Sequence, residues 1–359
     1  MDIKPFSPEL QRKIETLASK RQAITLGSVH FDSPLILAPM AGICTPPFRL
    51  LMEDLGAGGT VSELVSCHGI NHGNDRTMKM LKIDPRERNI GLQLFGEEPE
   101  AMAQAARVAQ EFSPKFIDIN MGCPVRKVVT KGGGSALLRE PQKLIPYLAA
   151  IKEVLNIPLS IKIRTGWDED SINAEEIVKI ATDLGIEWVA VHGRTRAQSY
   201  TGYANWDYLE KLAENSSLPI VGNGDLHQPH QVRERMNKTA CKAVMIARGC
   251  LRNPFIFLES YAEESDPKFE GPDYYEVIER LEDYTAQTYD NPRIRLIQMR
   301  KLIVWFAAGF PGAAKFRSKM FQCPDLPDSM KIAEDYYLSL GSSAKFIDYN
   351  EVFMNGGHG

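Results

Sequence analysis

The chain has 359 residues, of which 43% are hydrophobic and 25% are charged, and its formal net charge at pH 7 is −4. This balance is typical of a globular protein and argues against a generally basic nucleic-acid binder. The first twenty residues carry charges where a secretion signal needs an apolar core. No stretch approaches the roughly 18 apolar residues of a membrane span. We therefore expect a cytoplasmic protein that is not associated with a membrane.

The cysteines are scattered along the chain and form no C-x-x-C pair. That spacing favours reduced thiols over a disulfide framework. The six cysteines are Cys44, Cys67, Cys123, Cys241, Cys250 and Cys323.

Short apolar runs alternate with helical patterns over most of the chain. The runs begin roughly 23 to 43 residues apart, close to the period of one βα unit. Eight such units over about 250 residues predict a (β/α)8 barrel, or TIM barrel. A doubly wound sheet is the competing fold, but the glycine fingerprint of a dinucleotide fold is missing after the first strand. The predicted strands are Leu35–Ala38, Thr60–Glu63, Ile90–Leu94, Phe116–Asn120, Leu159–Ile163, Trp188–Val191, Ile220–Gly222 and Ala243–Ile246.

The composition divides the chain into four parts. We expect an N-terminal extension at 1–30, with a helix and a hairpin-like lid across the barrel's bottom. The barrel is predicted at 31–258, a smaller helical domain at 259–340 and a tail at 341–359.

Charge is distributed unevenly within the predicted helical domain. Glu259–Asp290 holds eleven acidic residues against two basic ones, and Asn291–Gln322 holds seven basic residues and no acidic one. Helical spacing places three apolar residues of the acidic half on one face and three acidic residues on the opposite face, which should point away. The basic half could bind a polyanion, although a solvated face is the plainer interpretation of a charge run. The six residues of the two faces are Tyr274, Ile278 and Leu281, and Glu276, Glu279 and Asp283.

The segment DINMGCP, residues 118–124, ends one of the predicted strands. Pro124 ends the ladder because it lacks an N–H, and Cys123 lies just past the strand. The three glycines at 132–134 then provide a hinge. A cysteine in this position is a candidate for chemistry, and a buried inert thiol is the plainer alternative.

Polar residues and glycines follow the other strands too, at the face where TIM barrels carry function. Jointly, a cation, an uncharged amide and two loops of the phosphate-binding type suggest a phosphorylated heterocycle such as FMN. These features are Ala38–Gly42 after the first strand, Gln93, Lys162 and Arg164, His192–Arg194, Gly222–Asp225 and Ala247–Gly249.

Together these motifs resemble the tRNA-dihydrouridine synthase family. The similarity runs in order from about residue 34 to about residue 320. Two details depart from the family pattern: Ala247 stands where glycine is common, and Cys67-His68 follows the second strand. The motifs are APMAG, DINMGCPVRKVV, GGGSALL, IKIRTGW, HGRTRAQSYTGYANW, VGNGD, MIARG and MRKLIVWFAAGFPGAAKFR.

The resemblance implies an enzyme that binds FMN at the barrel mouth, reduces it with NADPH and passes hydride to C6 of a uridine in tRNA. It implies that Cys123 protonates C5 and that Lys162 stabilises negative charge on the flavin. FMN would be held by Pro39, Met40, Ala41, Gln93, Lys162, His192, Asn223, Gly224, Asp225, Ala247 and Arg248. The tRNA would meet Asn120 and Arg164 at the uracil edge, Arg194, Arg196, Tyr200 and Tyr203 by stacking, and Arg300, Arg317 and Lys319 on the helical domain.

Other functions stay open at this stage. A dihydroorotate dehydrogenase-like enzyme shares the FMN barrel but acts on a free pyrimidine and needs no basic helical domain. A non-catalytic RNA-binding protein on a barrel scaffold is another alternative. A metal site from Cys44, Cys67, His68 and Cys123 has no supporting metal-type spacing. The pattern does not indicate the modified uridine, a preference for NADPH over NADH or an oligomeric state, and no obligate protein partner is evident.

Overall fold

Eight parallel strands close into a barrel in the computed structural model, which describes residues 3–342, 347–350 and 353. Each strand pairs with the next along the chain, and the last returns to the first, so the predicted TIM barrel is confirmed. Every predicted strand is present, with bounds that differ by at most three residues. The strands are β3 (Leu35–Leu37), β4 (Gly59–Ser66), β5 (Ile90–Phe95), β6 (Phe116–Met121), β7 (Leu159–Arg164), β8 (Trp188–His192), β9 (Ile220–Asn223) and β10 (Ala243–Ile246).

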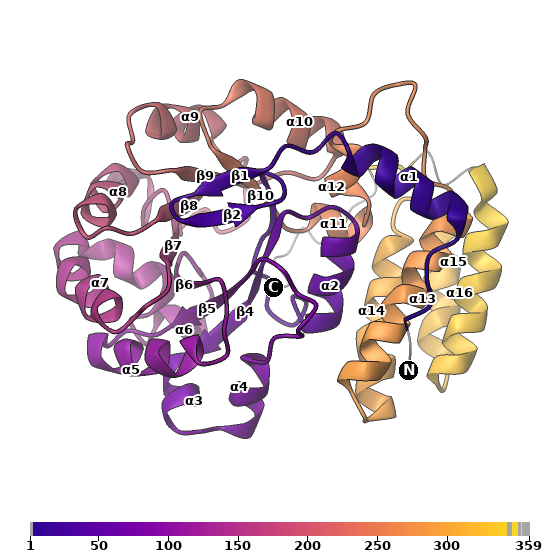
Figure 1. Ribbon diagram of the computed structural model, residues 1–359, viewed down its shortest axis with the longest axis horizontal. Helices are drawn as coiled ribbons and strands as arrows, with labels where there is room; N and C mark the ends of the chain where they lie inside the picture. The colour runs from indigo at the N-terminus through magenta and orange to yellow at the C-terminus, as the bar shows by residue number, and fades with distance from the viewer. Residues whose placement is uncertain (1–2, 343–346, 351–352, 354–359) are drawn as a thin grey trace.

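Helices follow the strands and form the outer layer of the barrel (Figure 1). In α5 (Pro99–Gln110), the proline lies in the first turn, and alanines and a methionine at helical spacing are buried against the sheet. The other helices of this layer are α2 (Pro46–Asp54), α3 (Cys67–Asn71), α4 (Asp75–Met80), α7 (Leu144–Glu153), α8 (Ala174–Asp183), α9 (Trp206–Glu214), α10 (Pro229–Lys238), α11 (Gly249–Arg252) and α12 (Ile256–Glu259). The short helix α6 (Arg126–Val129) lies in the loop after β6. Short 3-10 turns are η1 (Gly134–Arg139), η2 (Pro141–Lys143) and η3 (Glu169–Ser171).

The N-terminal hairpin closes the barrel at the end where the strands begin. It consists of β1 (Ile24–Leu26) and β2 (Val29–Phe31). The ring of Phe31 lies 6.0 Å from that of Phe116 and 5.9 Å from that of Trp188, both in edge-to-face contact. The predicted lid is therefore confirmed, and an apolar plug fills the lower part of the barrel.

A bundle of four helices lies beside the barrel (Figure 1). Its first helix packs against α2. An aromatic cluster centred on Tyr274 joins this helix to residues that come before it and after it in the chain. The Tyr274 ring meets Phe255 at 5.0 Å and Phe310 at 5.1 Å, edge to face in both cases. The helices are α13 (Gly271–Thr288), α14 (Pro292–Phe306), α15 (Ala313–Gln322) and α16 (Leu326–Leu340).

The acidic face of α13 does not point away into solvent as predicted, because the N-terminal segment covers it. The Lys4 ammonium lies 2.8 Å from a carboxylate oxygen of Glu279, and the backbone N–H of Ser7 donates to Glu276 at 2.7 Å. Helix α1 (Pro8–Ala18) adds a buried ion pair of 2.7 Å between Lys13 and Asp273. Complementary charge thus anchors the N-terminal extension on the bundle.

None of the helices in the described ranges has both the length and the apolar character needed to cross a membrane. The predicted tail at 341–359 lies mostly outside the described residues.

Candidate active site

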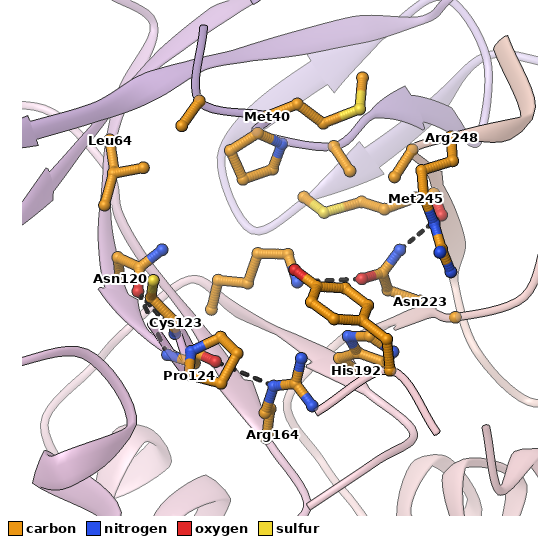
Figure 2. A pocket seen from close by; sticks show the side chains of 18 of the residues that line it. Met40, Leu64, Asn120, Cys123, Pro124, Arg164, His192, Asn223, Met245 and Arg248 are labelled. Carbon is orange, nitrogen blue, oxygen red and sulfur yellow. Dashed lines mark hydrogen bonds between the residues drawn. The ribbon is translucent and has the colours of Figure 1, made fainter. Parts of the chain in front are cut away.

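The carboxyl ends of the strands surround one pocket, which contains every residue predicted to hold the cofactor. Figure 2 shows Asn120 and Cys123 on one side of this pocket, with Asn223 and His192 across from them. Apolar side chains, among them Met40 and Leu64, form part of the wall. Its other lining residues include Pro39, Ala41, Gln93, Lys162, Arg164, Tyr200, Gly224, Asp225, Met245, Ala247 and Arg248.

A chain of hydrogen bonds crosses the neighbouring strands β5, β6 and β7 beneath this pocket. Strand register brings Asp118 level with Gln93 on one side and with Ser160 on the other. The Ser160 hydroxyl donates to Asp118 at 2.6 Å, and the Gln93 amide donates to the other carboxylate oxygen at 2.7 Å. The amide of Asn120 donates in turn to Gln93 Oε1 at 2.8 Å. The polar ends of Gln93 and Asn120 are therefore held in fixed orientations.

The same chain of hydrogen bonds ends at Cys123, the candidate acid. Asn120 Oδ1 accepts a hydrogen bond of 3.0 Å from the backbone N–H of Cys123. On its other side, the Cys123 carbonyl accepts from the backbone N–H and the hydroxyl of Ser135, at 3.1 and 2.9 Å. Gly134 has φ +58, and a Cβ there would lie 2.8 Å from that carbonyl oxygen. The glycine run therefore lets the loop pack closely against Cys123.

Burial raises the pKa of the Cys123 thiol above its usual value, and the positive charges of Arg164 and Lys162 offset only part of that shift. A thiol has an ordinary pKa of about 8.5, so Cys123 is protonated at neutral pH. Such a group can donate a proton but is a poor nucleophile.

Lys162 presents a partly buried positive charge to the pocket. Its ammonium donates to Asn223 Oδ1 at 3.0 Å, and the Asn223 amide donates to the Met245 carbonyl at 2.9 Å. Burial and the neighbouring Arg164 lower the pKa of Lys162 to about 8. The side chain is therefore still charged at pH 7. Among the described residues, no carboxylate lies within 4.0 Å of its ammonium.

The same pocket contains His192. Burial, with the positive charges of Arg164, Lys162 and Arg194, lowers the pKa of His192 well below its usual value. The imidazole is consequently uncharged at neutral pH and can accept as well as donate a hydrogen bond. Register places His192 beside Arg164 on one strand and beside Asn223 on the other.

Two arginines predicted to meet the substrate hold the surrounding loops. Arg164 donates to the carbonyls of Gly122, Thr195 and Ser199 at 2.9, 2.8 and 2.7 Å, which joins the Cys123 loop to the loop after β8. Arg194 donates to the loop carbonyls at 201 and 202 and to Asp225, the last at 2.7 Å. Both are 2% exposed. Their contact with the substrate stays a prediction.

Aromatic and cationic groups continue outward from the pocket. The Tyr200 ring has the guanidiniums of Arg164 and Arg248 at 5.6 and 5.3 Å from its centroid. Tyr203, in the same loop, is 89% exposed. Arg196 does not line the pocket and lies over the ring of Trp167, at 4.3 Å.

The basic stretch of the bundle is divided between inner and outer positions. Arg300 is half-buried and donates to the Cys323 carbonyl at 2.6 Å. Lys301 donates to the Gly42 carbonyl beside the pocket. By contrast, the α15 residues Arg317 and Lys319 are exposed, as is Lys315.

Sequence reasoning missed Asp118, Ser160 and His227 as parts of the site. Asp118 alternates with Ile117 and Ile119, and this alternation is the signal of an inward-facing residue. Burial raises the pKa of Asp118 and, with nearby arginines, lowers the pKa of His227 to about 4. Ser160 and His227 carried no comparable signal in the sequence. Strand register brings Ser160 to Asp118, and the loop after β9 brings His227 to the pocket.

The donor set of the pocket fits a flavin mononucleotide. Amides and a cation can meet the edge of a ring, while Pro39, Met40 and Ala41 offer a wall for its flat face. Gly224 has φ +129, and Arg248 adds positive charge beside this turn, where a phosphate could bind. Among residues 3–342, 347–350 and 353, no group of three or more His, Cys, Asp or Glu could hold a metal ion. The Cys44 thiol instead donates to the Ala38 carbonyl.

Comparison with known proteins agrees with this geometry. The model of a family described as dihydrouridine synthase (Dus) matches residues 36–339. The chain is 37% identical over 304 residues to tRNA-dihydrouridine synthase B of Pseudomonas syringae pv. tomato, which covers 82% of this chain and 89% of that protein. It is 33% identical over 336 residues to a probable tRNA-dihydrouridine synthase of Rickettsia conorii, which covers 91% of this chain and all of that one.

A solved structure supports the barrel fold alone. The 6-hydroxypseudooxynicotine amine oxidase from Pseudomonas geniculata N1 superposes with a TM-score of 0.51 at 13% identity. The match covers 68% of this chain and about half, 49%, of that larger one. The family assignment comes instead from the sequence, since the matched region takes in the pocket and most of the helical bundle. The chain belongs to the dihydrouridine synthase family.

Proposed function

We propose that this protein reduces uridine in tRNA to 5,6-dihydrouridine, with FMN in the barrel pocket and NADPH as the source of electrons. Family membership supports the reaction, and the relatives described above carry tRNA-dihydrouridine synthase as their name. The donor set of the pocket supports the cofactor.

The observation that carries the proposal is that the Cys123 thiol, whose pKa is raised by burial, lines the same pocket as the partly buried Lys162 ammonium. Reduction of the uracil C5=C6 bond needs a hydride for one carbon and a proton for the other. When bound and reduced by NADPH, FMN would supply hydride to C6. Cys123 donates its proton to C5, and the resulting thiolate regains a proton from water.

The remaining residues orient these groups. Asn120 fixes the backbone of Cys123 through its 3.0 Å hydrogen bond, and Arg164 ties the same loop to the Tyr200 loop. Lys162 would hold the cofactor from the pocket wall and would favour negative charge on its ring. Neutral His192 and Asn223 offer further hydrogen bonds to the ring or its side chain.

The exposed cations of α15 favour tRNA over a free pyrimidine as the substrate. Lys315, Arg317 and Lys319 are exposed on a helix outside the pocket, where a small molecule bound within it would not reach them. A polyanion would gain from such a surface. This observation argues against the dihydroorotate dehydrogenase-like alternative.

Dihydrouridine mapping at nucleotide resolution tests the proposal. We expect tRNA from cells that lack the protein to lose dihydrouridine at defined positions, and the purified parent protein with NADPH to restore it. The purified parent should also be yellow and should release FMN on denaturation. Unchanged dihydrouridine in the deficient cells, together with no formation in the purified reaction, would refute the proposed function.

A further inference from the structure

Three side chains from three different loops stack at the barrel mouth. Trp167 follows β7, Arg139 ends η1 and Arg196 follows β8. The guanidinium carbon of Arg139 lies 3.5 Å from the centroid of the Trp167 ring, and that of Arg196 lies 4.3 Å from it. Both cations share one indole ring, so their guanidinium carbons are at most about 8 Å apart.

Neither cation is neutralised by an acidic side chain. Within the described residues, no carboxylate lies within 4.0 Å of Arg139 or Arg196. The nearest acids along the chain bond elsewhere, since Asp168 accepts from the Ser171 hydroxyl at 2.6 Å and Glu140 pairs with Lys143 at 2.7 Å. The Nε of Arg196 is buried and has no hydrogen-bond partner. Two positive charges are thus held close together, and at least one N–H donor has no hydrogen-bond partner among the described residues. An anion bound there would offset the repulsion between the charges and accept hydrogen bonds from the guanidiniums.

The stack is tied to both loops that border the active site. On the Arg139 side, η1 begins at the segment that bonds the Cys123 carbonyl, and the Asn173 amide donates to the Leu138 carbonyl at 2.7 Å. On the other side, the backbone N–H of Arg196 donates to the Gly166 carbonyl at 2.9 Å. The stack therefore lies between the loop that carries the candidate acid and the loop that carries Tyr200.

More positive charge lies on the Cys123 loop itself. Arg126, Lys127 and Lys131 are exposed and form no ion pair among the described residues. This loop thus adds three exposed cations near the stack, although the chain as a whole carries a net charge of −4.

We propose that Arg139, Trp167 and Arg196 form a clamp for a backbone phosphate of the tRNA strand next to the target uridine. The inference rests on the proposed function for its substrate. A base that leaves its stack to enter a pocket needs its backbone held outside the pocket, and the planar guanidinium fork matches a phosphate. The indole keeps both guanidiniums oriented before the tRNA arrives, which reduces the ordering cost of binding.

Substitution of the two arginines in the full-length flavoprotein tests the clamp. Arg139→Gln, Arg196→Gln and the double variant are compared with Arg107→Gln, which removes an exposed charge from the outer helix α5. The probe is tRNA lacking dihydrouridine, and its affinity is measured over a series of KCl concentrations. Each clamp variant should flatten the slope of log K against log salt by roughly 0.7 to 0.9, whereas the control should leave it unchanged.

Steady-state kinetics and a charge-conserving variant sharpen the result. KM for tRNA should rise by about tenfold in the single variants, while NADPH-driven flavin reduction stays at the parent rate. Arg139→Lys should restore the salt slope but less of the affinity, because an ammonium neither stacks nor binds a phosphate through two parallel bonds.

An unchanged salt slope in both single variants, with or without a lower melting temperature, would mean that the stack only pins the two loops together. This outcome is separable from failure of the proposed function. Dihydrouridine formation by the parent is measured on the same tRNA. An active parent with unchanged salt slopes in the variants would refute the clamp alone. A parent that makes no dihydrouridine would refute the proposed function.

Discussion

Lys162 carries a positive charge that its surroundings in the pocket disfavour. Its pKa falls from the usual 10.5 to about 8, first through burial and then through Arg164. At 1.36 kcal/mol for each pKa unit, that shift corresponds to roughly 3 kcal/mol by which the site disfavours the charged form. We predict that Lys162→Met removes this cost from the flavin-free protein while it weakens flavin binding.

The sign of the change in unfolding free energy with pH follows from the linkage between proton binding and folding. The folded pKa lies below the unfolded one, so between pH 8 and 10.5 the unfolded chain binds more protons at this lysine than the folded chain does. The parent should therefore gain stability as the pH rises through this window. Integrated from pH 7 to pH 9.5, the gain from Lys162 alone is roughly 2 kcal/mol. The Lys162→Met variant lacks this contribution.

Urea unfolding of the flavin-free parent and variant at pH 7 and pH 9.5 measures the effect. The difference in unfolding free energy between the two proteins should shift by roughly 2 kcal/mol in favour of the parent at the higher pH. Other titrating groups are common to both proteins and cancel in this comparison. Lys211→Met, at an exposed position on α9, is the matched control and should show no shift.

Loss of the Lys162 donor also leaves Asn223 Oδ1 unpaired, which offsets part of the gain at pH 7 by roughly 1 to 3 kcal/mol. That offset is the same at both pH values and does not alter the shift. A parent-to-variant difference that is equal at pH 7 and pH 9.5 would refute the depressed pKa. Unaltered flavin retention in Lys162→Met would refute its role in the cofactor site.

Three further predictions concern the acid, the turn after β9 and the outer helix. Cys123→Ala should keep the flavin and bind tRNA, yet lose dihydrouridine formation by about 10²-fold or more, and near-normal single-turnover reduction of tRNA would exclude the thiol as the acid. Gly224→Ala should lose stability and flavin content, measured by melting temperature and flavin absorbance per protein, because its Cβ would lie 2.6 Å from that of Ala204 at φ +129. Replacement of Arg317 and Lys319 by Gln should flatten the salt slope for tRNA binding by up to roughly 1.4 to 1.8, whereas Arg300→Gln should mainly lower the melting temperature because its guanidinium bonds the Cys323 carbonyl.

Strand positions in this fold were predictable because they depend on local pattern. In FIDIN, residues 116–120, apolar and polar residues alternate, and a barrel turns that alternation into an inner and an outer face. Lys162 and His192 were recognisable as site residues for the same reason, since they come late in their strands, where parallel strands present side chains to one mouth.

What could not be predicted depends on contacts between distant segments. The acidic face of α13 reads as solvated from its own sequence, and only the arrival of residues 4–13 from the other end of the chain changes that. Similarly, the basic run of α14 and α15 has uniform sign along the sequence. Whether a given cation points inward or outward is decided by tertiary packing, as Arg300 and Lys319 illustrate.

The inward cations give the helical bundle a structural role besides the tRNA binding proposed for its exposed cations. Lys301, on α14, donates to the carbonyl of Gly42, whose N–H donates to Glu63 at 2.5 Å. Gly42 follows Pro39, Met40 and Ala41, which form one wall of the pocket. Burial lowers the pKa of Lys301, and the attraction of Glu63 opposes that shift. The bundle therefore helps to fix the shape of this wall of the pocket, so the barrel mouth and the bundle would act together in holding the proposed flavin.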